Sequence, residues 1–201
     1  FRWIVSNKGV TFTGNADYQS SDDPNPTIQT LTNQQFETLT PWDSVRHDFY
    51  TFRLAMAHLA AYKPRVLYLA LGETDDWAHN GRYDRTLQAL NQFDDYLQEL
   101  WEWLEADSQY RNRTGIIITV DHGRGNTAAD WTDHGNATEG AQYIWMAFVS
   151  PTVSLRGEWS DHEPIRQNQV AATLAHFLGF NFRTQTPTAG PPIETLFVQE
   201  Q

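Results

Sequence analysis

Two short segments are apolar at almost every position, and a long amphipathic stretch separates them. The segments are Val66–Leu71 and Gly115–Val120; from Tyr83 to about Ala106, hydrophobic residues recur every three or four positions, as on one face of a helix. A strand without alternating polar residues is typical of a parallel sheet covered on both faces. The sequence therefore predicts an α/β fold with a mainly parallel sheet and helices on both of its faces.

The flanking sequence adds two helices and a third strand to this pattern. Hydrophobic residues spaced three and four apart predict a helix over residues 44–63, which ends before Pro64. A second helix is predicted over residues 167–178, followed by Gly179, and an apolar strand over residues 143–149.

The first 42 residues are polar and rich in turn-forming residues. Only residues 2–6 and 10–12 resemble strands there, so we expect an irregular segment that belongs to a cap or a linker. The α/β domain is then expected to occupy residues 43–201.

Composition excludes several kinds of protein. The 201 residues include 14 Lys and Arg against 25 Asp and Glu, a net charge of −11, and no Cys. The absence of Cys excludes a disulfide scaffold, a thiolate zinc site and a cysteine nucleophile. An acidic chain is unsuited to binding a nucleic-acid backbone. No apolar run approaches the ~18 residues that a membrane-spanning helix needs.

Metal-ligating side chains follow the two apolar strands. Asp75 and His79 come shortly after the first, Asp121 and His122 directly follow the second, and His134 lies twelve residues beyond His122. In open α/β sheets, ligands bind at the carboxyl ends of strands. Mixed carboxylate and imidazole sets suit Zn²⁺, Mn²⁺ or Fe²⁺. We predict a metal site here, with a loop from Asp75 to His79 that turns both side chains toward one ion.

Other residues of the same types have simpler explanations. The remaining histidines are predicted to be solvated or to have ordinary protein partners; these are His47, His58, His162 and His176.

The ordered set of motifs resembles the alkaline phosphatase superfamily. It consists of Asp75-xxx-His79, Thr119-Val-Asp121-His122-Gly123 and His134-Gly135. The superfamily includes alkaline phosphatases, nucleotide pyrophosphatase/phosphodiesterases, sulfatases and cofactor-independent phosphoglycerate mutases. The helix ending in Leu178-Gly179 and the segment Gly190-Pro-Pro-Ile193 are also similar to it. The resemblance extends from about residue 43 to residue 193.

The resemblance implies an α/β enzyme with two divalent metal ions, of which zinc is expected and manganese, magnesium or calcium remain alternatives. Asp75, His79 and His134 would hold one ion. Asp121 and His122 would hold the other, together with an Asp and a Ser, Thr or formylglycine nucleophile from further upstream. The implied substrate is a small-molecule phosphate or sulfate ester.

Several neighbours of these motifs have alternative roles. Arg124 follows the Asp-His-Gly motif and has a planar guanidinium suited to phosphate or sulfate, although a surface arginine in an acidic chain is an equal alternative. The two carboxylates beside the ligands would either orient imidazole ligands or be solvated. The two nearby tryptophans would either line the substrate pocket or pack on the loops. These residues are Asp76, Asp133, Trp77 and Trp131.

The upstream part of the family pattern is not recognisable in this sequence. Thr11, Thr13 and Ser20 qualify as nucleophiles by residue type alone. We therefore expect the chain to be the C-terminal part of such an enzyme and to be inactive in isolation. The alternatives are a catalytically silent metal-binding domain and a phosphoryl-transfer mutase of the same fold. Because many relatives are exported, a periplasmic or secreted location is expected, with a cytoplasmic one as the alternative.

Overall fold

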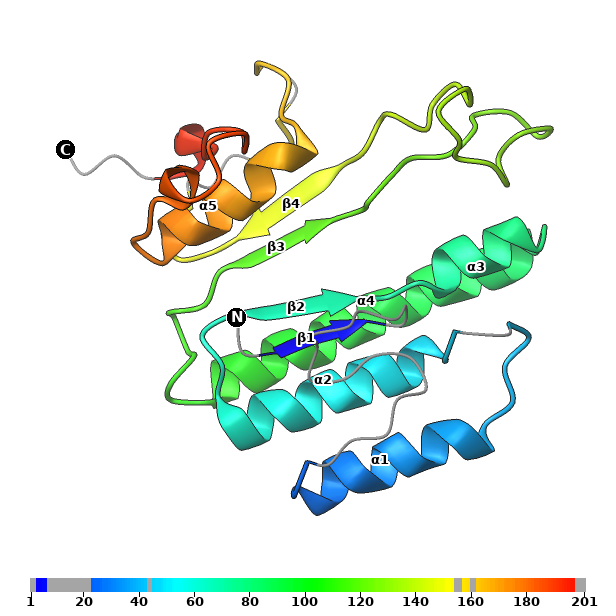
Figure 1. Ribbon diagram of the computed structural model, residues 1–201, viewed down its shortest axis with the longest axis horizontal. Coiled ribbons are helices and arrows are strands. Elements are labelled where there is room, and N and C mark those ends of the chain that lie inside the picture. The colour runs from blue at the N-terminus through cyan, green and yellow to red at the C-terminus, as the bar shows by residue number, and fades with distance from the viewer. Residues whose placement is uncertain (1–2, 7–22, 43–44, 154–156, 160–161, 198–201) are drawn as a thin grey trace. The chain divides into compact units, whose positions relative to one another are not determined.

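The computed structural model describes residues 3–6, 23–42, 45–153, 157–159 and 162–197. The chain divides into two compact units, Phe1–Trp101 and Glu102–Gln201. Within the described residues, each unit contains one two-stranded sheet with helices (Figure 1).

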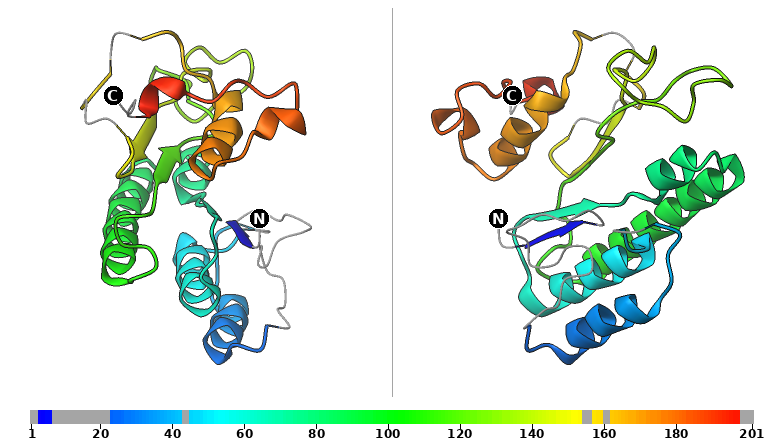
Figure 2. Two further views of the ribbon diagram at one scale, coloured as in Figure 1. Left: turned by 90° about the vertical axis from the view of Figure 1, so that its left-hand side faces the viewer. Right: turned by 45° about the vertical axis from the view of Figure 1, so that its right-hand side comes forward.

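The first unit is built around a parallel pair of strands. β1 (Trp3–Ser6) pairs with β2 (Leu67–Ala70), and Trp3 lies opposite Leu67. Helix α1 lies beside α2 in both views of Figure 2. The helices of this unit are α1 (Pro26–Glu37), α2 (Asp48–Tyr62), α3 (Glu73–His79) and most of α4 (Tyr83–Ala106).

The hydrophobic core of this unit joins α1, α2 and β2. Ile28 of α1 and Leu54 and Ala55 of α2 are almost completely buried, and leucines of β2 pack against them. On another side of α2, Phe52 stacks on Tyr96 of α4 with ring centroids 4.2 Å apart. Removing these apolar surfaces from water holds α1 and α4 on α2.

The second unit is built around an antiparallel pair. β3 (Ile116–Thr119) pairs with β4 (Met146–Val149), so that Ile116 lies opposite Val149. A 3₁₀ turn at Gln167–Gln169 leads into α5 (Val170–Phe177). Short 3₁₀ turns at Phe182–Thr184 and Glu194–Leu196 follow.

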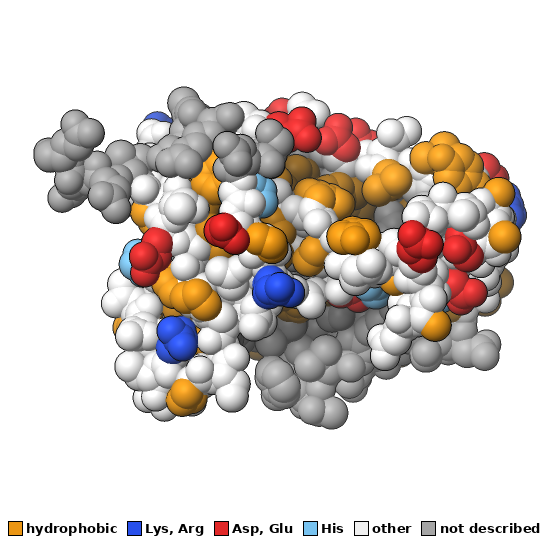
Figure 3. Space-filling view, turned by 90° about the horizontal axis from the view of Figure 1, so that it is seen from above, with side chains coloured by type: hydrophobic (Ala, Val, Ile, Leu, Met, Phe, Trp, Pro, Cys, Tyr) orange, Lys and Arg blue, Asp and Glu red, His pale blue; other side chains and the backbone are white. Residues whose placement is uncertain are grey.

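The surface carries exposed acidic and hydrophobic side chains. Figure 3 shows carboxylates among hydrophobic side chains and few Lys or Arg, in keeping with the net charge of −11. Among the described helices, none combines the length and the apolar character needed to cross a bilayer.

The element order predicted from sequence is largely confirmed, with shifts at the ends. The amphipathic helix Tyr83–Ala106 is confirmed at both ends, whereas α2 begins four residues later than predicted and the third strand begins at Met146. The α/β class holds, but among the strands of the described residues only β1 and β2 are parallel, while β3 and β4 are antiparallel. Apolar runs at β2 and β3 indicated burial, and burial does not fix the direction of the neighbouring strand.

The prediction of an irregular segment over residues 1–42 is wrong for residues 26–37. Asn25 caps α1, because its side-chain oxygen accepts hydrogen bonds from the N–H groups of Thr27 and Ile28. The buried positions of α1 are Ile28, Thr32 and Gln35. Two of them are polar, so the buried face lacks the hydrophobic signal by which a helix is recognised from sequence.

The predicted loop from Asp75 to His79 is also wrong, because these residues belong to α3. The helix begins immediately after Gly72. The Asp48 carboxylate accepts hydrogen bonds from the N–H groups of Gly72 (2.8 Å) and Glu73 (3.0 Å). These N–H groups at the helix start have no partner within the helix, and a carboxylate from α2 supplies one.

One buried histidine of this unit gives a pH-dependent stability. His58 is fully buried, and burial lowers its pKa to about 4, partly opposed by the nearby Asp23 carboxylate. Below pH 6.5 the His58 side chain becomes protonated in the unfolded chain, whereas in the native state it stays neutral until the pH approaches 4. The free energy of unfolding therefore falls as the pH drops toward 4. We expect a loss of about 2 kcal/mol between pH 7 and pH 5 from this group. Urea unfolding at both pH values checks it: His58→Leu should reduce the loss, whereas His162→Leu should not, and equal losses in all three proteins would contradict the prediction.

Candidate metal centre

Helix α3 places Asp75 and His79 one turn apart on the same face. The Asp75 Oδ1 and His79 Nε2 atoms are 3.5 Å apart, and the two side chains are 17% and 43% exposed. This separation exceeds that of a good N–H···O hydrogen bond. It matches the spacing of two ligands on a tetrahedral Zn²⁺ ion, about 3.4 Å for metal–ligand distances near 2.05 Å.

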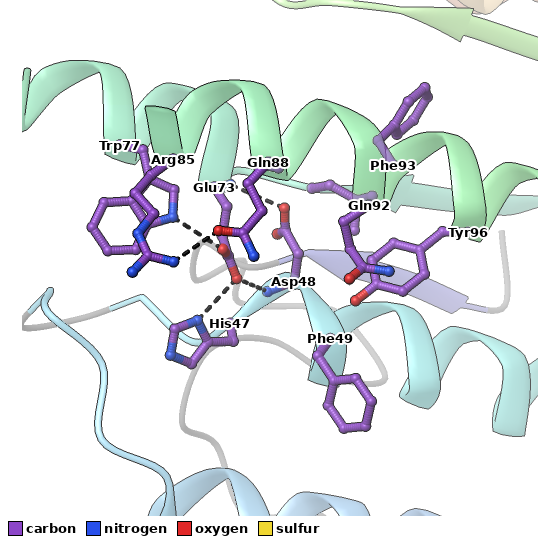
Figure 4. Close-up of a pocket in the computed structure, with 12 residues that line it drawn as sticks. His47, Asp48, Phe49, Glu73, Trp77, Arg85, Gln88, Gln92, Phe93 and Tyr96 are labelled. Carbon is purple, nitrogen blue, oxygen red and sulfur yellow. Dashed lines mark hydrogen bonds and ion pairs between the residues drawn. The ribbon is translucent and has the colours of Figure 1, made fainter. Parts of the chain in front are cut away.

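The opposite face of α3 is anchored to α2 through Glu73. The Glu73 carboxylate accepts hydrogen bonds from the His47 ring at Nδ1 (2.9 Å), the Asp48 backbone N–H (2.9 Å) and the Trp77 indole N–H (3.2 Å), as Figure 4 shows. Positions 73 and 77 lie on the far side of the helix from positions 75 and 79, since two residues correspond to about 200°. The ligand face of α3 is therefore left unobstructed by its anchor.

Asp48 and Glu73 are linked reciprocally, each carboxylate accepting a backbone N–H from the other residue. Burial raises the pKa of Asp48 to about 7, although the two backbone N–H donors oppose the rise. Burial would also raise the pKa of Glu73, but the hydrogen bond from His47 and the other donors bring the Glu73 pKa below its usual value. The hydrogen bond to Glu73 in turn raises the pKa of His47.

A cavity of about 240 Å³ lies beside this anchor, bordered by α2, α3 and α4 (Figure 4). Its wall consists of the anchor residues His47, Asp48 and Glu73, which join α2 to α3, and of aromatic and amide side chains of α2 and α4. The lining residues are His47, Asp48, Phe49, Leu71, Glu73, Trp77, Arg85, Gln88, Ala89, Gln92, Phe93 and Tyr96.

In the second unit, Asp121 and His122 follow β3 and turn toward each other. The His122 ring lies with Nδ1 2.9 Å from the Gly123 carbonyl, which suits Nδ1–H as the donor and leaves Nε2 with a lone pair. His122 Nε2 is 3.6 Å from Asp121 Oδ1, and the Asp121 side chain is 82% exposed. This spacing also matches two ligands of a tetrahedral ion.

His134 stacks on His122. The ring centroids are 3.6 Å apart and the rings are inclined by only 8°. The near-parallel stack brings the two imidazole rings into contact, so the segments that carry His122 and His134 lie side by side. The second unit thus gathers Asp121, His122 and His134.

Close backbone packing holds these two loops together. The Gly123 N–H donates to the Ala141 carbonyl at 2.8 Å, and the Gly125 N–H donates to the Asp133 carbonyl at 2.9 Å. The Arg124 guanidinium donates to the Thr132 carbonyl at 2.8 Å. Arg124 therefore ties the loop of His122 to the loop of His134, and its role in substrate binding remains a prediction.

Gln167, in the 3₁₀ turn before α5, supports the segment that follows β3 and was not recognised from sequence. Its side-chain amide donates to the carbonyls of Asp121 (2.9 Å) and Val120 (3.4 Å). A glutamine 46 residues away carries no local signal of this contact, and only the fold reveals it.

We expect Gln167→Ala to weaken metal binding at the Asp121 and His122 pair about tenfold, as other losses of outer contacts around metal ligands do. Because Gln167 is exposed, the melting temperature should change little. Isothermal titration with Zn²⁺ measures the affinity, and Gln185→Ala, an exposed glutamine of the same unit, is the control. Wild-type affinity in Gln167→Ala would contradict the prediction.

The other predicted positions have mixed outcomes. Trp77 lines the cavity of the first unit, and Asp133 contributes its carbonyl to the loop contact with Gly125. The nucleophile candidates Thr11, Thr13 and Ser20 lie outside the described residues.

The comparisons with known proteins agree with the motifs. The family model "Type I phosphodiesterase / nucleotide pyrophosphatase" matches residues 3–177. Searches of curated proteins and of solved structures gave no significant match. The family is a member of the alkaline phosphatase superfamily, so the resemblance seen in the motifs is confirmed. With most of its length matched, the chain belongs to the type I phosphodiesterase / nucleotide pyrophosphatase family.

Proposed function

We propose that this chain carries metal ligands of a metal-dependent hydrolase of small-molecule phosphate esters, of the phosphodiesterase or pyrophosphatase type. One observation carries the proposal. Two Asp–His pairs, Asp75 with His79 and Asp121 with His122, each separate an oxygen and a nitrogen by the distance that a shared cation requires. Family membership supports the same reaction class.

The ligand sets follow the family pattern. Asp75, His79 and His134 would hold one ion, and Asp121 and His122 would contribute to the other. The donor chemistry fits zinc, because imidazole nitrogen and carboxylate oxygen are both good zinc ligands and no thiolate is available. Manganese, magnesium and calcium are the alternatives.

Bound divalent ions would supply positive charge that activates an attacking oxygen and stabilises a leaving oxygen. The residues of the chain would orient the metal ligands for that chemistry. His122 presents Nε2 because its Nδ1 faces a carbonyl, and Glu73 fixes the helix that presents Asp75 and His79. Arg124 donates to the Thr132 carbonyl through Nη1, and its guanidinium would also contribute positive charge near substrate oxygens.

A second candidate is a catalytically silent metal-binding domain. It is favoured by the lack of a nucleophile that can be assigned among the described residues. Sulfate esters and mutase chemistry remain lesser alternatives, because the matching family is named for phosphodiester and pyrophosphate substrates.

The test has two stages. Zn²⁺ titration of the chain should show binding that Asp75→Ala and Asp121→Ala weaken, with exposed Asp84→Ala as the matched control. The protein is then assayed with bis(p-nitrophenyl) phosphate, p-nitrophenyl phosphate and p-nitrophenyl sulfate. We expect the diester to be hydrolysed fastest, with free product and no rearranged ester.

Failure of the chain to bind Zn²⁺, Mn²⁺ or Co²⁺ would overturn the proposal. Metal binding without turnover of any ester would favour the silent domain, and preference for the sulfate would favour a sulfatase.

A further inference from the structure

The contacts around α3 have a consequence for metal binding, which rests on the proposed function. Asp75 and His79 lie on a helix of seven residues, and an isolated helix of this length is unstable in water. The separation of their ligand atoms is therefore set by whatever fixes α3 in the fold.

Asp48 is the residue best placed to fix it. Its side chain is buried, with the residue 7% exposed, and both of its carboxylate oxygens are used. Oδ1 accepts the Gly72 N–H and Oδ2 accepts the Glu73 N–H, so one rigid carboxylate grips the first turn of α3 at two points. Rotation or fraying of that turn would break both bonds at once.

A second hydrogen bond joins the same two residues in the opposite sense, from the Asp48 N–H to the Glu73 carboxylate. Glu73 accepts the Asp48 N–H at the start of α2 and the His47 ring, so the starts of α2 and α3 are joined through both carboxylates. Helix α2 is itself held in the core by Leu54 and Ala55. The start of α3 is thereby fixed relative to the hydrophobic core. Glu73, one of the residues that fix it, lies two positions before Asp75, the first proposed metal ligand.

We infer that Asp48 is a positioning residue for the metal pair on α3: its bidentate contact with the Gly72 and Glu73 N–H groups sets the spacing of Asp75 and His79 that a cation needs. Asp48 does not ligate the ion, since its two oxygens face the backbone of α3. Its effect is expected in the affinity and geometry of the bound ion as well as in stability.

The test uses Co²⁺, whose visible absorption reports on coordination geometry. Asp48→Asn is made in the 201-residue chain with Asp121→Ala as the background, so that the other pair contributes less. Asparagine keeps one carbonyl oxygen for one of the two N–H groups, and its NH₂ group faces the other. We expect Co²⁺ affinity to fall about tenfold and the absorption bands to change in shape or intensity.

Leu59→Val in the same background is the matched control. Leu59 is 2% exposed and lies in the last turn of α2, whereas Asp48 is at its start, so truncation of Leu59 lowers stability without changing the contacts of Asp48 with α3. We expect this variant to melt at a lower temperature and to bind Co²⁺ with the parent affinity and spectrum.

The outcomes separate the two proposals. A parent protein that binds no Co²⁺ overturns the proposed function. A parent that binds, with Asp48→Asn giving the same affinity and spectrum, overturns the positioning role alone. The positioning role is equally overturned if Leu59→Val reproduces the Asp48→Asn change, or if Asp48→Asn does not fold at 15 °C, because Asp48 then serves stability alone.

Discussion

Replacing His79 or His134 by alanine is expected to abolish measurable Zn²⁺ binding at the site that the family pattern assigns to them. Each change removes one of the three protein ligands proposed for that ion. The remaining carboxylate and imidazole would hold a divalent cation far more weakly, and we expect the affinity to fall at least about a hundredfold, the upper end for the loss of an outer contact.

The loss of metal has a thermal consequence. Zn²⁺ at about 100 times its dissociation constant stabilises the native state by about 2.7 kcal/mol. For a chain of this size that corresponds to a melting temperature higher by about 5–10 °C. EDTA should remove this increment from the wild-type protein and should lower the melting temperature of His79→Ala and His134→Ala by less, because only the Asp121 and His122 pair can still bind metal in these variants.

His162→Ala is the matched control, since His162 is exposed and its ring lies against the neighbouring Glu163 carbonyl. This variant should bind Zn²⁺ and respond to EDTA as the wild type does. A wild-type melting curve that EDTA does not shift would contradict the prediction, as would an EDTA response in both histidine variants as large as that of the wild type.

Gly123→Ala is expected to open the loop that carries His122. A Cβ atom at position 123 would lie 2.3 Å from the Tyr143 carbonyl oxygen and 2.6 Å from the Gly140 carbonyl oxygen. Both obstacles are backbone atoms, so no side chain can swing away. The Gly123 N–H bond to the Ala141 carbonyl would have to lengthen or break as the two segments separate.

We expect Gly123→Ala to cost about 3 kcal/mol, the upper end for an extra methyl group in a packed site. The melting temperature should drop by about 6–12 °C. Because His122 adjoins the displaced residue, Zn²⁺ affinity at the Asp121 and His122 pair should drop as well, measured by titration below the melting range.

Gly135→Ala is the control for this variant. Position 135 adjoins His134, yet a Cβ atom there would meet only the Thr138 hydroxyl, at an ordinary 3.8 Å. We expect near-wild-type stability. If Gly123→Ala melted and bound Zn²⁺ like Gly135→Ala, the close packing of the two loops would not be needed for the site.

The strand ends show how much of the site the sequence reveals. Asp75, Asp121 and His122 stand just beyond apolar runs, and the rule that ligands bind at strand ends was sufficient to select them. His134 was selected by its residue type twelve positions beyond His122 and then by its order in the family pattern. The structure then places it on His122, a contact that spacing along the chain does not imply.

The roles of the residues that join α2 to α3 could not be recognised from the sequence. His47 was predicted to have an ordinary environment, and Asp48 and Glu73 gave no signal, because a carboxylate at a helix start is common. Their significance comes from a contact between residues about 25 positions apart. Likewise, α1 buries Thr32 and Gln35, and a helix that buries polar side chains has weak amphipathic character.

The sequence by itself determined the α/β class, the family, the ends of α4 and the residue types of the candidate metal site, because periodicity and order are local properties of a chain. The tertiary structure decided that Asp75 and His79 share a helical face, that β4 runs antiparallel to β3, and that Gly123 serves close packing. These depend on backbone contacts between distant segments, and a backbone N–H or carbonyl is the same in every sequence, so its partner is visible only in the fold.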